Sequence, residues 1–330
     1  MATIGSAGVA RTANYDGLGL GHDYTSYASS GATGYIPVLF AKQMLRNFYE
    51  TAAYPLIANT DYTGQIKNVG DSVIIRKAPT LTISPYTVGG TLTYEIPTST
   101  SVELNIDTAQ SWAFRLDDID ELQSDIGLMK EFSAAAARDL ENAIDVDCLS
   151  TWAAGAAAAN VGDTAGAKTG SIVLGTSGAG NGVAITGGES GNAVDFIMSC
   201  NQVLDEQNIP SEGRWIVLPS WFITMLKTGV LRRADVTGDS SGVIRSGVVG
   251  MIDKFMVLRN NNLPWDNTNK NSSILFGTKE AITFAMQLTK TDTLQIQDSF
   301  GTYVRGLAVY GKAVVQPTAL GVGIVHYGAN

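Results

Sequence analysis

The chain has 330 residues, of which 45% are hydrophobic and 16% charged, so one elaborated domain or two domains with a sizeable core are expected. The net charge of -9 at pH 7 argues against a protein that grips nucleic acid through its phosphates, because such a protein needs a basic surface. We expect no membrane span and no signal peptide, since no apolar run is long enough for the first and the N-terminus lacks the basic start of the second. Cys148 and Cys200 form no disulfide framework, and we interpret them as buried thiols of an intracellular product.

The N-terminal residues 1 to about 35 are rich in Gly, Ser, Ala and Tyr and show no helical or strand period. They predict an arm, which either docks on a neighbour through its tyrosines or is a disordered tail. Pro37 then suits the first turn of a helix that stops before Pro55. Three apolar residues recur in this helix at a spacing of four: Phe40, Met44 and Phe48.

From Gly64 to Asp107 the hydrophobic period changes to two, which is typical of strands. A β-rich run covers Val73 to Lys77. Apolar residues alternate with polar ones in two further runs: Leu92, Tyr94, Ile96, and Val102, Leu104, Ile106. With Gly89-Gly90 at its tip, this segment predicts a long two-stranded ribbon. Such a ribbon is marginal alone in water, so we expect it to lie against a partner chain.

A long amphipathic helix is predicted within Asp117–Ala158, running from about Asp125. Ser124 can cap its first turn, and acidic residues at and before this end suit the helix dipole. Its apolar or small residues recur three or four positions apart: Met129, Phe132, Ala136, Leu140, Ile144, Cys148 and Trp152. At about 1.5 Å per residue, a helix of roughly 34 residues is about 50 Å long, so we expect it to span the molecule.

A low-complexity stretch follows from Asn160 to Gly191, with a short β-like piece at Ser171–Leu174, and predicts a surface insertion. Beyond it, helix and strand alternate, which is typical of an α/β subdomain. The expected helices are Asn192–Asn208 and Trp221–Lys227, and the expected strands are Arg214–Leu218, Phe255–Leu258 and Ser273–Phe276. β character returns in Gln287–Ile296 and in Gly301–Val315, where a strand ends at Pro317.

One motif fits the nucleophile elbow of serine hydrolases, the pentapeptide G-D-S-S-G at 238–242. Ser240, Asp292 and His326 also occur in the order nucleophile, acid, base. The elbow, however, needs a buried strand before it and a helix after it, and the preceding residues RRADVT are not a buried strand. We therefore favour a glycine-serine turn at this position.

Other candidate sites have simpler structural explanations. Residues 162–169 resemble a phosphate loop, but Ala167 stands where the second glycine is required. The acidic run Asp117–Glu121 could hold a divalent cation, and we favour carboxylates at a helix start. Only His22 and His326 supply imidazole, so acid–base or zinc chemistry is poorly provided for. The sequence therefore predicts no enzymatic activity, no catalytic residue, no cofactor and no metal site.

The order of elements and several short motifs resemble the major capsid proteins of tailed bacteriophages, which have the Hong Kong 97-like fold. NTDYTG at 59–64 followed by GDSV at 70–73 looks like the start of the family's extended E-loop. AAARDLENAID at 135–145 is similar to its spine helix. Four further segments are similar to its A-domain and later strands: LDEQNIP at 204–210, RWIVLP at 214–219, KFMVLRNNNLP at 254–264 and RGLAVYGKAVVQP at 305–317.

The resemblance implies an α+β fold with an N-arm, an extended E-loop hairpin, a P-domain with a long spine helix, and an α/β A-domain. The implied segments are 1–63 for the N-arm and its helix, 64–110 for the E-loop, 111–158 for the spine helix of the P-domain, 159–190 for a Gly-rich insertion, 191–285 for the A-domain and 286–330 for the rest of the P-domain. It implies a coat protein that assembles into hexamers and pentamers of an icosahedral shell around double-stranded DNA.

The same resemblance implies partners and a location. The first partner is the protein itself, with scaffolding, portal and decoration proteins as further candidates, non-specific contact with packaged DNA, and no membrane. The implied location is the virion capsid, assembled in the cytoplasm of a bacterial host. Three alternatives remain open: an encapsulin-like compartment with the same fold, a serine hydrolase using Ser240, and a cell-surface or tail β-protein.

Overall fold

The computed structural model describes residues 52–64, 72–79, 81–85, 87–91, 94–118, 128–178, 180–188, 190–228, 250–295 and 300–328, which all belong to one compact unit, Arg46–Asn330. The predicted arm and the helix after Pro37 lie outside these residues. The described residues form four α-helices: α2 Tyr54–Ile57, α4 Leu128–Ala154, α5 Ala193–Glu206 and α6 Ser220–Thr228. They also form 3-10 turns at Asp61–Gly64, Ala158–Asn160, Lys279–Ala281 and Pro317–Ala319. Pro55, expected just beyond a helix, lies in the first turn of α2.

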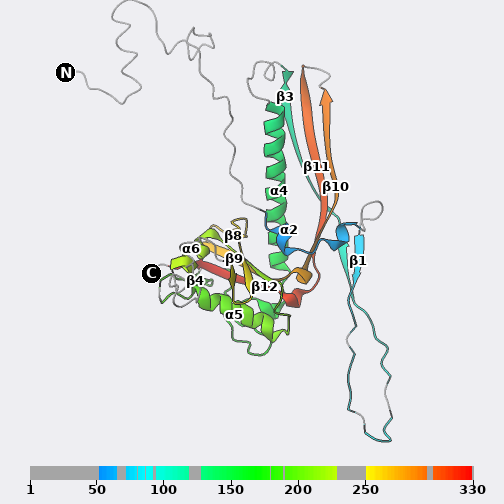
Figure 1. Ribbon diagram of the computed structural model, residues 1–330, viewed down its shortest axis with the longest axis vertical. Coiled ribbons are helices and arrows are strands. Elements are labelled where there is room, and N and C mark those ends of the chain that lie inside the picture. The colour runs from blue at the N-terminus through cyan, green and yellow to red at the C-terminus, as the bar shows by residue number, and fades with distance from the viewer. Residues whose placement is uncertain are drawn as a thin grey trace, which may run out of the picture. The chain divides into compact units, whose positions relative to one another are not determined.

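The strands of the described residues form three sheets (Figure 1). A two-stranded sheet pairs β1 Ser72–Arg76 with β2 Ser101–Asn105, and a three-stranded sheet has the order β10 Ile282–Gln295, β11 Gly301–Val314, β3 Thr108–Asp117. A seven-stranded sheet has the order β4 Val183–Ile185, β12 Leu320–Tyr327, β9 Asn271–Thr278, β5 Arg214–Leu218, β7 Phe255–Arg259, β6 Met251–Ile252, with β8 Trp265–Asp266 paired to β9. The fold is therefore α+β, as the sequence predicts.

The long helix α4 is confirmed, but it ends earlier than expected. It ends at Ala154, four residues before the predicted end, and the described helix begins at Leu128. Gly155 follows it, and a Cβ at that position would press into Val314 of β11, so the close approach of β11 explains why glycine stands at this end. Described residues after Gly155 turn away, with the N–H of Ala157 donating to the carbonyl of Pro317.

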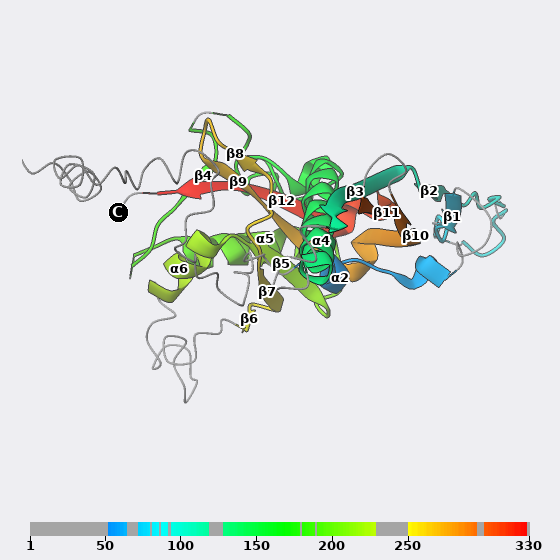
Figure 2. The ribbon, with the colours of Figure 1, turned by 90° about the horizontal axis from the view of Figure 1, so that it is seen from above.

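Helix α4 packs along the three-stranded sheet and then into a second core (Figures 1 and 2). In its N-terminal half the predicted apolar residues are half-buried, and the ring of Phe132 meets Phe114 of β3 edge-on at 5.8 Å. In its C-terminal half Ile144, Cys148 and Trp152 are fully buried, as their spacing predicts. The helix therefore packs against the three-stranded sheet along its N-terminal half and enters the core beneath the seven-stranded sheet with its C-terminal half.

Polar contacts fix the C-terminal half of α4 on β11. The Tyr310 hydroxyl donates to Asp147 Oδ2 at 2.6 Å, and Lys312 forms an ion pair with the same carboxylate. Burial alone would raise the pKa of Asp147, but the hydrogen bonds from Lys312 and Tyr310 outweigh it and the pKa is lowered. Burial, and after it the hydrogen bond to Asp147, raise the pKa of Tyr310, so its proton stays in the hydrogen bond.

Strand β3 was not predicted, although its sequence carries the signal of a half-buried strand. Trp112, Phe114 and Leu116 face inward or are half-buried, and alternate with the exposed Ala113 and Arg115. The partner of Trp112 on β11 is Gly306, which leaves room for the indole because a Cβ there would collide with the ring. The strand forms the edge of the three-stranded sheet, opposite β10.

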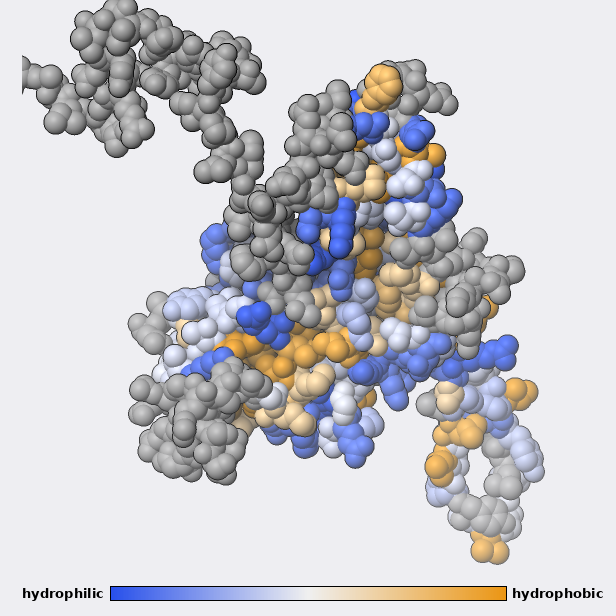
Figure 3. Space-filling model, turned by 45° about the horizontal axis from the view of Figure 1, so that its top comes forward, coloured by the Kyte–Doolittle hydropathy of each residue, from blue (hydrophilic) through white to orange (hydrophobic). Residues whose placement is uncertain are grey.

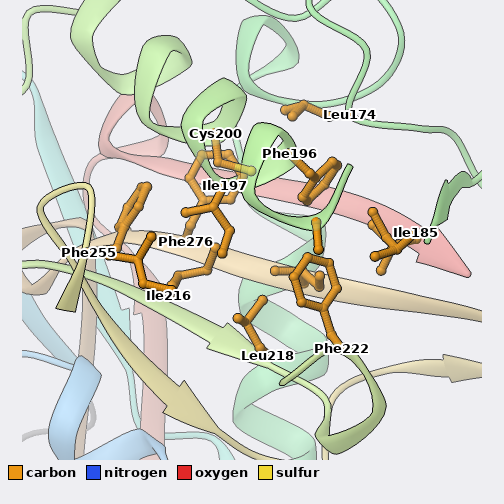
Figure 4. Close-up of a cluster of buried hydrophobic side chains, with 14 of the residues drawn as sticks. Leu174, Ile185, Phe196, Ile197, Cys200, Ile216, Leu218, Phe222, Phe255 and Phe276 are labelled. Carbon is orange, nitrogen blue, oxygen red and sulfur yellow. The ribbon is translucent and has the colours of Figure 1, made fainter. Parts of the chain in front are cut away.

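The seven-stranded sheet carries a core on each face. All five residues of β5 are buried because the strand is central. Ile216 and Leu218 face the cluster covered by α5 and α6, shown in Figure 4, whereas Trp215 and Val217 face the cluster that contains Trp152 of α4. The helices and strands predicted between residues 192 and 276 are confirmed. Strand β12, which falls within the predicted P-domain segment 286–330, pairs here with β9 and β4.

Part of the segment 160–191, expected to be a surface insertion, enters the core. Leu174 and Ile185 are fully buried in the core under α5, and Asn160 donates to the carbonyls of Thr318 and Leu320 at 2.7 and 2.9 Å. The β-like piece around Ile172 forms a single bridge to Ala165, and β4 pairs with β12 in parallel. The glycines give this segment its turns, and its few apolar residues complete the core.

Both cysteines are free and buried, as expected. Burial raises the pKa of the thiols of Cys148 and Cys200, so both remain protonated and act as small apolar groups. None of the described helices has the length and apolarity that crossing a bilayer requires.

Candidate assembly surface

The base of the predicted hairpin is an ordered, packed structure. Strands β1 and β2 pair antiparallel from Ser72 opposite Asn105 to Arg76 opposite Ser101. A small core beneath them contains Ile75, Leu104, Ile106 and Ala285. At Gly311 of β11 a Cβ would collide with the carbonyl of Asn105, so the glycine lets the hairpin base lie directly on the three-stranded sheet.

The outer part of the hairpin differs from the prediction. The described residues between Lys77 and Thr100 are in no strand, although a strand was expected around Tyr94 and Ile96; Leu92 lies outside the described residues. Lys77 N–H donates to Thr100 O at 2.8 Å at the end of the paired region. Three prolines in this stretch, Pro79, Pro85 and Pro97, lack the N–H that a ladder needs. The predicted turn is present, with Gly89 at φ 82° and Gly90 N–H donating to Thr87 O.

Large apolar side chains lie exposed on this hairpin (Figure 3). Their exposed fractions are 96% for Ile83, 99% for Val88, 88% for Tyr94 and 88% for Ile96. Burying one such side chain stabilises a complex by about 1.5–3 kcal/mol before the costs of ordering are subtracted. A cluster of exposed apolar groups of this kind marks a surface for a protein partner.

A second exposed apolar group lies where β10 ends and β11 begins. Leu294 is directly opposite Tyr303, and both are more than two-fifths exposed, while Phe300 is 82% exposed. Next to them Arg305 and Lys290 both pair with Asp292, at 3.3 and 3.2 Å. This end of the three-stranded sheet therefore offers apolar contact beside paired charges.

The residues of the hypothetical hydrolase are not brought together where the structure describes them. Ser240 lies outside the described residues. Asp292 is on β10 of the three-stranded sheet, where its carboxylate is held by Lys290 and Arg305. His326 is on β12 of the seven-stranded sheet, opposite Asn271. The acid and the histidine thus belong to different sheets.

The segment that resembles a phosphate loop binds a carboxylate of its own chain. Turn 166–170 directs the N–H groups of Lys168 and Thr169, at 2.9 and 3.0 Å, and the Thr169 hydroxyl at 2.9 Å toward Glu206 at the end of α5. Gly166, at φ 101°, lies against this carboxylate and has no room for a Cβ. The hydrogen bonds from the backbone of Lys168 and Thr169 lower the pKa of Glu206 to about 2. The donors that a phosphate would need are occupied.

Acid should release turn 166–170 only at very low pH. The pKa of Glu206 is lowered from 4.5 to about 2, so its contacts stabilise the fold above pH 4.5 and are lost as the pH falls through 2. The amide proton shifts of Lys168 and Thr169 in NMR spectra should titrate with a midpoint of about 2. In Glu206→Gln, which keeps the length of the side chain, this titration should vanish. A midpoint near pH 4.5 in the unmodified protein would contradict the bonding described.

Metal and ligand chemistry finds little support in the described part of the chain. No three His, Cys, Asp or Glu side chains there are grouped to hold a metal ion. Of the predicted acidic run, Asp117 bonds to Arg115 at 2.6 Å, and the residues from 119 to 121 are not described. An open pocket of about 590 Å³ at the hairpin base is lined by polar groups that include Arg76, Lys77 and Glu280. The most prominent functional feature is therefore the exposed apolar surface.

Comparison with known proteins finds solved structures that are similar to this chain. No protein-family model and no curated protein matches the chain. A solved structure from Mycobacterium phage Che8 matches with a TM-score of 0.70 at 25% identity, over 88% of this chain and 97% of that one. The capsid structure of cyanophage P-SCSP1u matches with a TM-score of 0.63 at 16% identity, over 90% and 94%. The capsid of cyanophage Pam1 matches with a TM-score of 0.63 at 13% identity, over 90% and 98%.

The chain thus has the Hong Kong 97-like fold, which confirms the fold predicted from sequence. Within that fold it resembles the major capsid proteins of tailed bacteriophages, and the matches extend over most of the chain. The exposed hairpin corresponds to the segment 64–110 that the sequence analysis assigned to the E-loop.

Proposed function

We propose that this chain is the major capsid protein of a tailed bacteriophage, which self-assembles into hexamers and pentamers of an icosahedral shell around double-stranded DNA. The observation that carries the proposal is the hairpin, whose base is packed on the subunit while its outer apolar side chains are 88–99% exposed. A neighbouring copy of the chain can cover them. Because the matched solved structures named above come from phages, a capsid is favoured over an encapsulin-like compartment.

The proposed assembly involves further partners and a location. A net charge of -9 suits the inner wall of a shell that contacts DNA without trapping it, because the wall repels phosphates. Scaffolding, portal and decoration proteins are the other partners proposed. Assembly takes place in the cytoplasm of the host bacterium, and the mature protein resides in the virion capsid.

Electron microscopy of the expressed protein tests the function. The chain is expressed alone and together with the genes beside its own, so that a separate scaffold is supplied if it is needed. Closed shells of uniform diameter are expected in at least one preparation. Folded monomers or small oligomers in both preparations would contradict the proposal.

We also propose that the protein is purely structural. Purified protein is expected to show no turnover of esters or phosphate esters above buffer, and Ser240→Ala should change nothing, since Asp292 and His326 lie in different sheets. Hydrolysis abolished by Ser240→Ala alone would contradict a non-catalytic role.

Assembled shells should need no covalent cross-link. The hairpin has two lysines, and Lys77 lies at its packed base, with its N–H bonded to Thr100, away from the Gly89-Gly90 tip; Lys67 is outside the described residues. Denaturing gels of mature shells should show a single band near 34.8 kDa. A ladder of oligomers that disappears in Lys77→Ala would overturn this expectation.

A further inference from the structure

A buried carboxylate in the middle of the molecule joins three parts of the chain. Asp145 of α4 is 0% exposed, and its two oxygens serve different segments. Oδ1 accepts the N–H groups of Ala53 and Tyr54 at 2.9 and 3.0 Å. Oδ2 accepts the side-chain amides of Asn260 and Asn262 at 2.6 and 2.9 Å. These four donors are neutral, so the charge is stabilised by hydrogen bonds of fixed direction.

The segment held by Oδ1 continues directly to the three-stranded sheet. After Tyr54, Ile57 is fully buried beside α4. The backbone of Asn59 then makes two hydrogen bonds to β10. Its N–H donates to Ile282 O and its carbonyl accepts from Phe284 N–H, both at 3.0 Å. Residues 52–59, which we call the strap, are thus attached to α4 at one end and to β10 at the other.

The segment held by Oδ2 belongs to the seven-stranded sheet. Asn260 follows β7 and donates its N–H to Leu218 O at the end of β5. The Asn261 side chain accepts the N–H of Ser220 at the start of α6, at 3.0 Å. The Asn262 amide also donates to Asn142 Oδ1 of α4 at 2.8 Å. Loop 260–262 therefore ties the strand ends of this sheet to the long helix.

We propose that Asp145 is a positioning residue for assembly, which fixes the orientation of the seven-stranded sheet relative to α4 and the three-stranded sheet. The inference rests on the proposed capsid function, because orientation matters most when every subunit of a shell must repeat it. The apolar core around Trp152 and Trp215 stabilises contact between these parts, but apolar contact has no direction. Four hydrogen bonds to one carboxylate supply the direction.

Because the two oxygens of Asp145 bind different segments, replacing the carboxylate by an amide should affect the two segments differently. In Asp145→Asn the amide keeps one acceptor, and this oxygen must turn to Ala53 and Tyr54 because backbone N–H groups cannot reverse. The new NH₂ then faces the donor amides of Asn260 and Asn262, so loop 260–262 loses its two bonds to residue 145 and keeps the bond of Asn262 to Asn142 on α4. Adding Asn260→Asp supplies a carboxylate that accepts this NH₂ and still accepts the N–H of Asn262, now bonded to Asn260 Oδ1 at 2.6 Å.

The test compares Asp145→Asn, the double variant Asp145→Asn with Asn260→Asp, and Leu149→Ala as a control. Leu149 is fully buried in the same core and makes no hydrogen bond through its side chain. Its truncation therefore destabilises the subunit but leaves the hydrogen bonds of Asp145 in place. Hydrogen exchange of residues 259–263 is measured on unassembled subunits, and shell diameters are measured by electron microscopy.

Asp145→Asn is expected to speed exchange in this loop by at least about tenfold and to give shells of several diameters. The double variant should restore slow exchange and one diameter, and Leu149→Ala should keep one diameter although its urea midpoint falls. Equal diameter distributions in Asp145→Asn and Leu149→Ala would overturn the inference, as would a folded double variant with irregular shells. If the unmodified protein forms no shells, the proposed function fails. Hydrogen exchange of loop 260–262 then tests the positioning by Asp145 alone, and an unchanged exchange rate in Asp145→Asn would overturn it.

Discussion

Ile83→Ser combined with Val88→Ser should abolish shell formation and leave the subunit folded. Both side chains are almost fully exposed in the single subunit, 96% and 99%, so their loss removes no packing within it. Burial of each by a neighbour contributes about 1.5–3 kcal/mol, and the contact recurs in every subunit. Electron microscopy should show no shells, while circular dichroism and the thermal midpoint remain those of the unmodified subunit.

A matched control separates apolar burial from mere disturbance of the hairpin. Thr82→Ser combined with Thr91→Ser changes two polar positions of the same hairpin and should assemble normally. Normal shells from the Ile83 and Val88 variant would show that these side chains face solvent in the assembled state, and the hairpin would lose its assigned role.

Trp152→Ala should cause the largest loss of stability of any single truncation in α4. The indole is fully buried between α4 and the seven-stranded sheet and is among the largest buried side chains of the described chain. Truncation of such a side chain costs about 3–5 kcal/mol, a large part of the roughly 5–15 kcal/mol that stabilises a domain. The urea midpoint of the unassembled subunit measures this loss, and a clearly lower midpoint than that of the unmodified protein is expected.

Trp152→Phe provides the comparison for this site. The indole Nε1 is buried and has no hydrogen-bond partner among the described residues, so replacing Trp by Phe breaks no bond there. Its cost should be less than half that of Trp152→Ala. Equal costs would mean that the N–H is bonded, for example to a buried water, and that this bond carries the stability.

The elements that sequence predicts well are those whose signal is local. In α4 the buried residues Ile144, Cys148 and Trp152 follow one another at the spacing of one helix face, and the structure confirms them. Strand β5 contains four apolar residues, Trp215–Leu218, directly before Pro219, and all of them are buried. Such patterns depend on the chain's own periodicity, which does not require knowledge of distant partners.

The errors fall where a distant part of the chain decides the structure. Residues 160–191 look like a surface insertion because glycine dominates, but Leu174 and Ile185 complete a core formed with α5 and β12. The alternation around Tyr94 and Ile96 predicts a strand, yet these residues have no ladder partner among the residues that the structure describes, and their apolar side chains are exposed. Periodicity reports which side chains are apolar and not which surface will cover them.

The site was only partly accessible from sequence. The hairpin was identified as a surface for a partner because an isolated ribbon is marginal in water. The hydrogen bonds of Asp145 are not predicted, although a signal exists: a carboxylate directly after Ile144 borders the buried face of α4, where a charge is costly unless it is bonded. Its donors come from residues 53–54 and 260–262, and no local pattern connects these segments to it.

The position of β12 has a kinetic consequence for a protein made on ribosomes. This strand lies between β4 and β9 inside the seven-stranded sheet, yet all other described strands precede it in the chain. Until Leu320–Tyr327 has been synthesised, β4 has no strand beside it and β9 lacks one neighbour. Pairing between such distant segments is slow to form because a long loop must close first. A nascent chain therefore exposes the apolar side chains of its hairpin before the seven-stranded sheet can be completed.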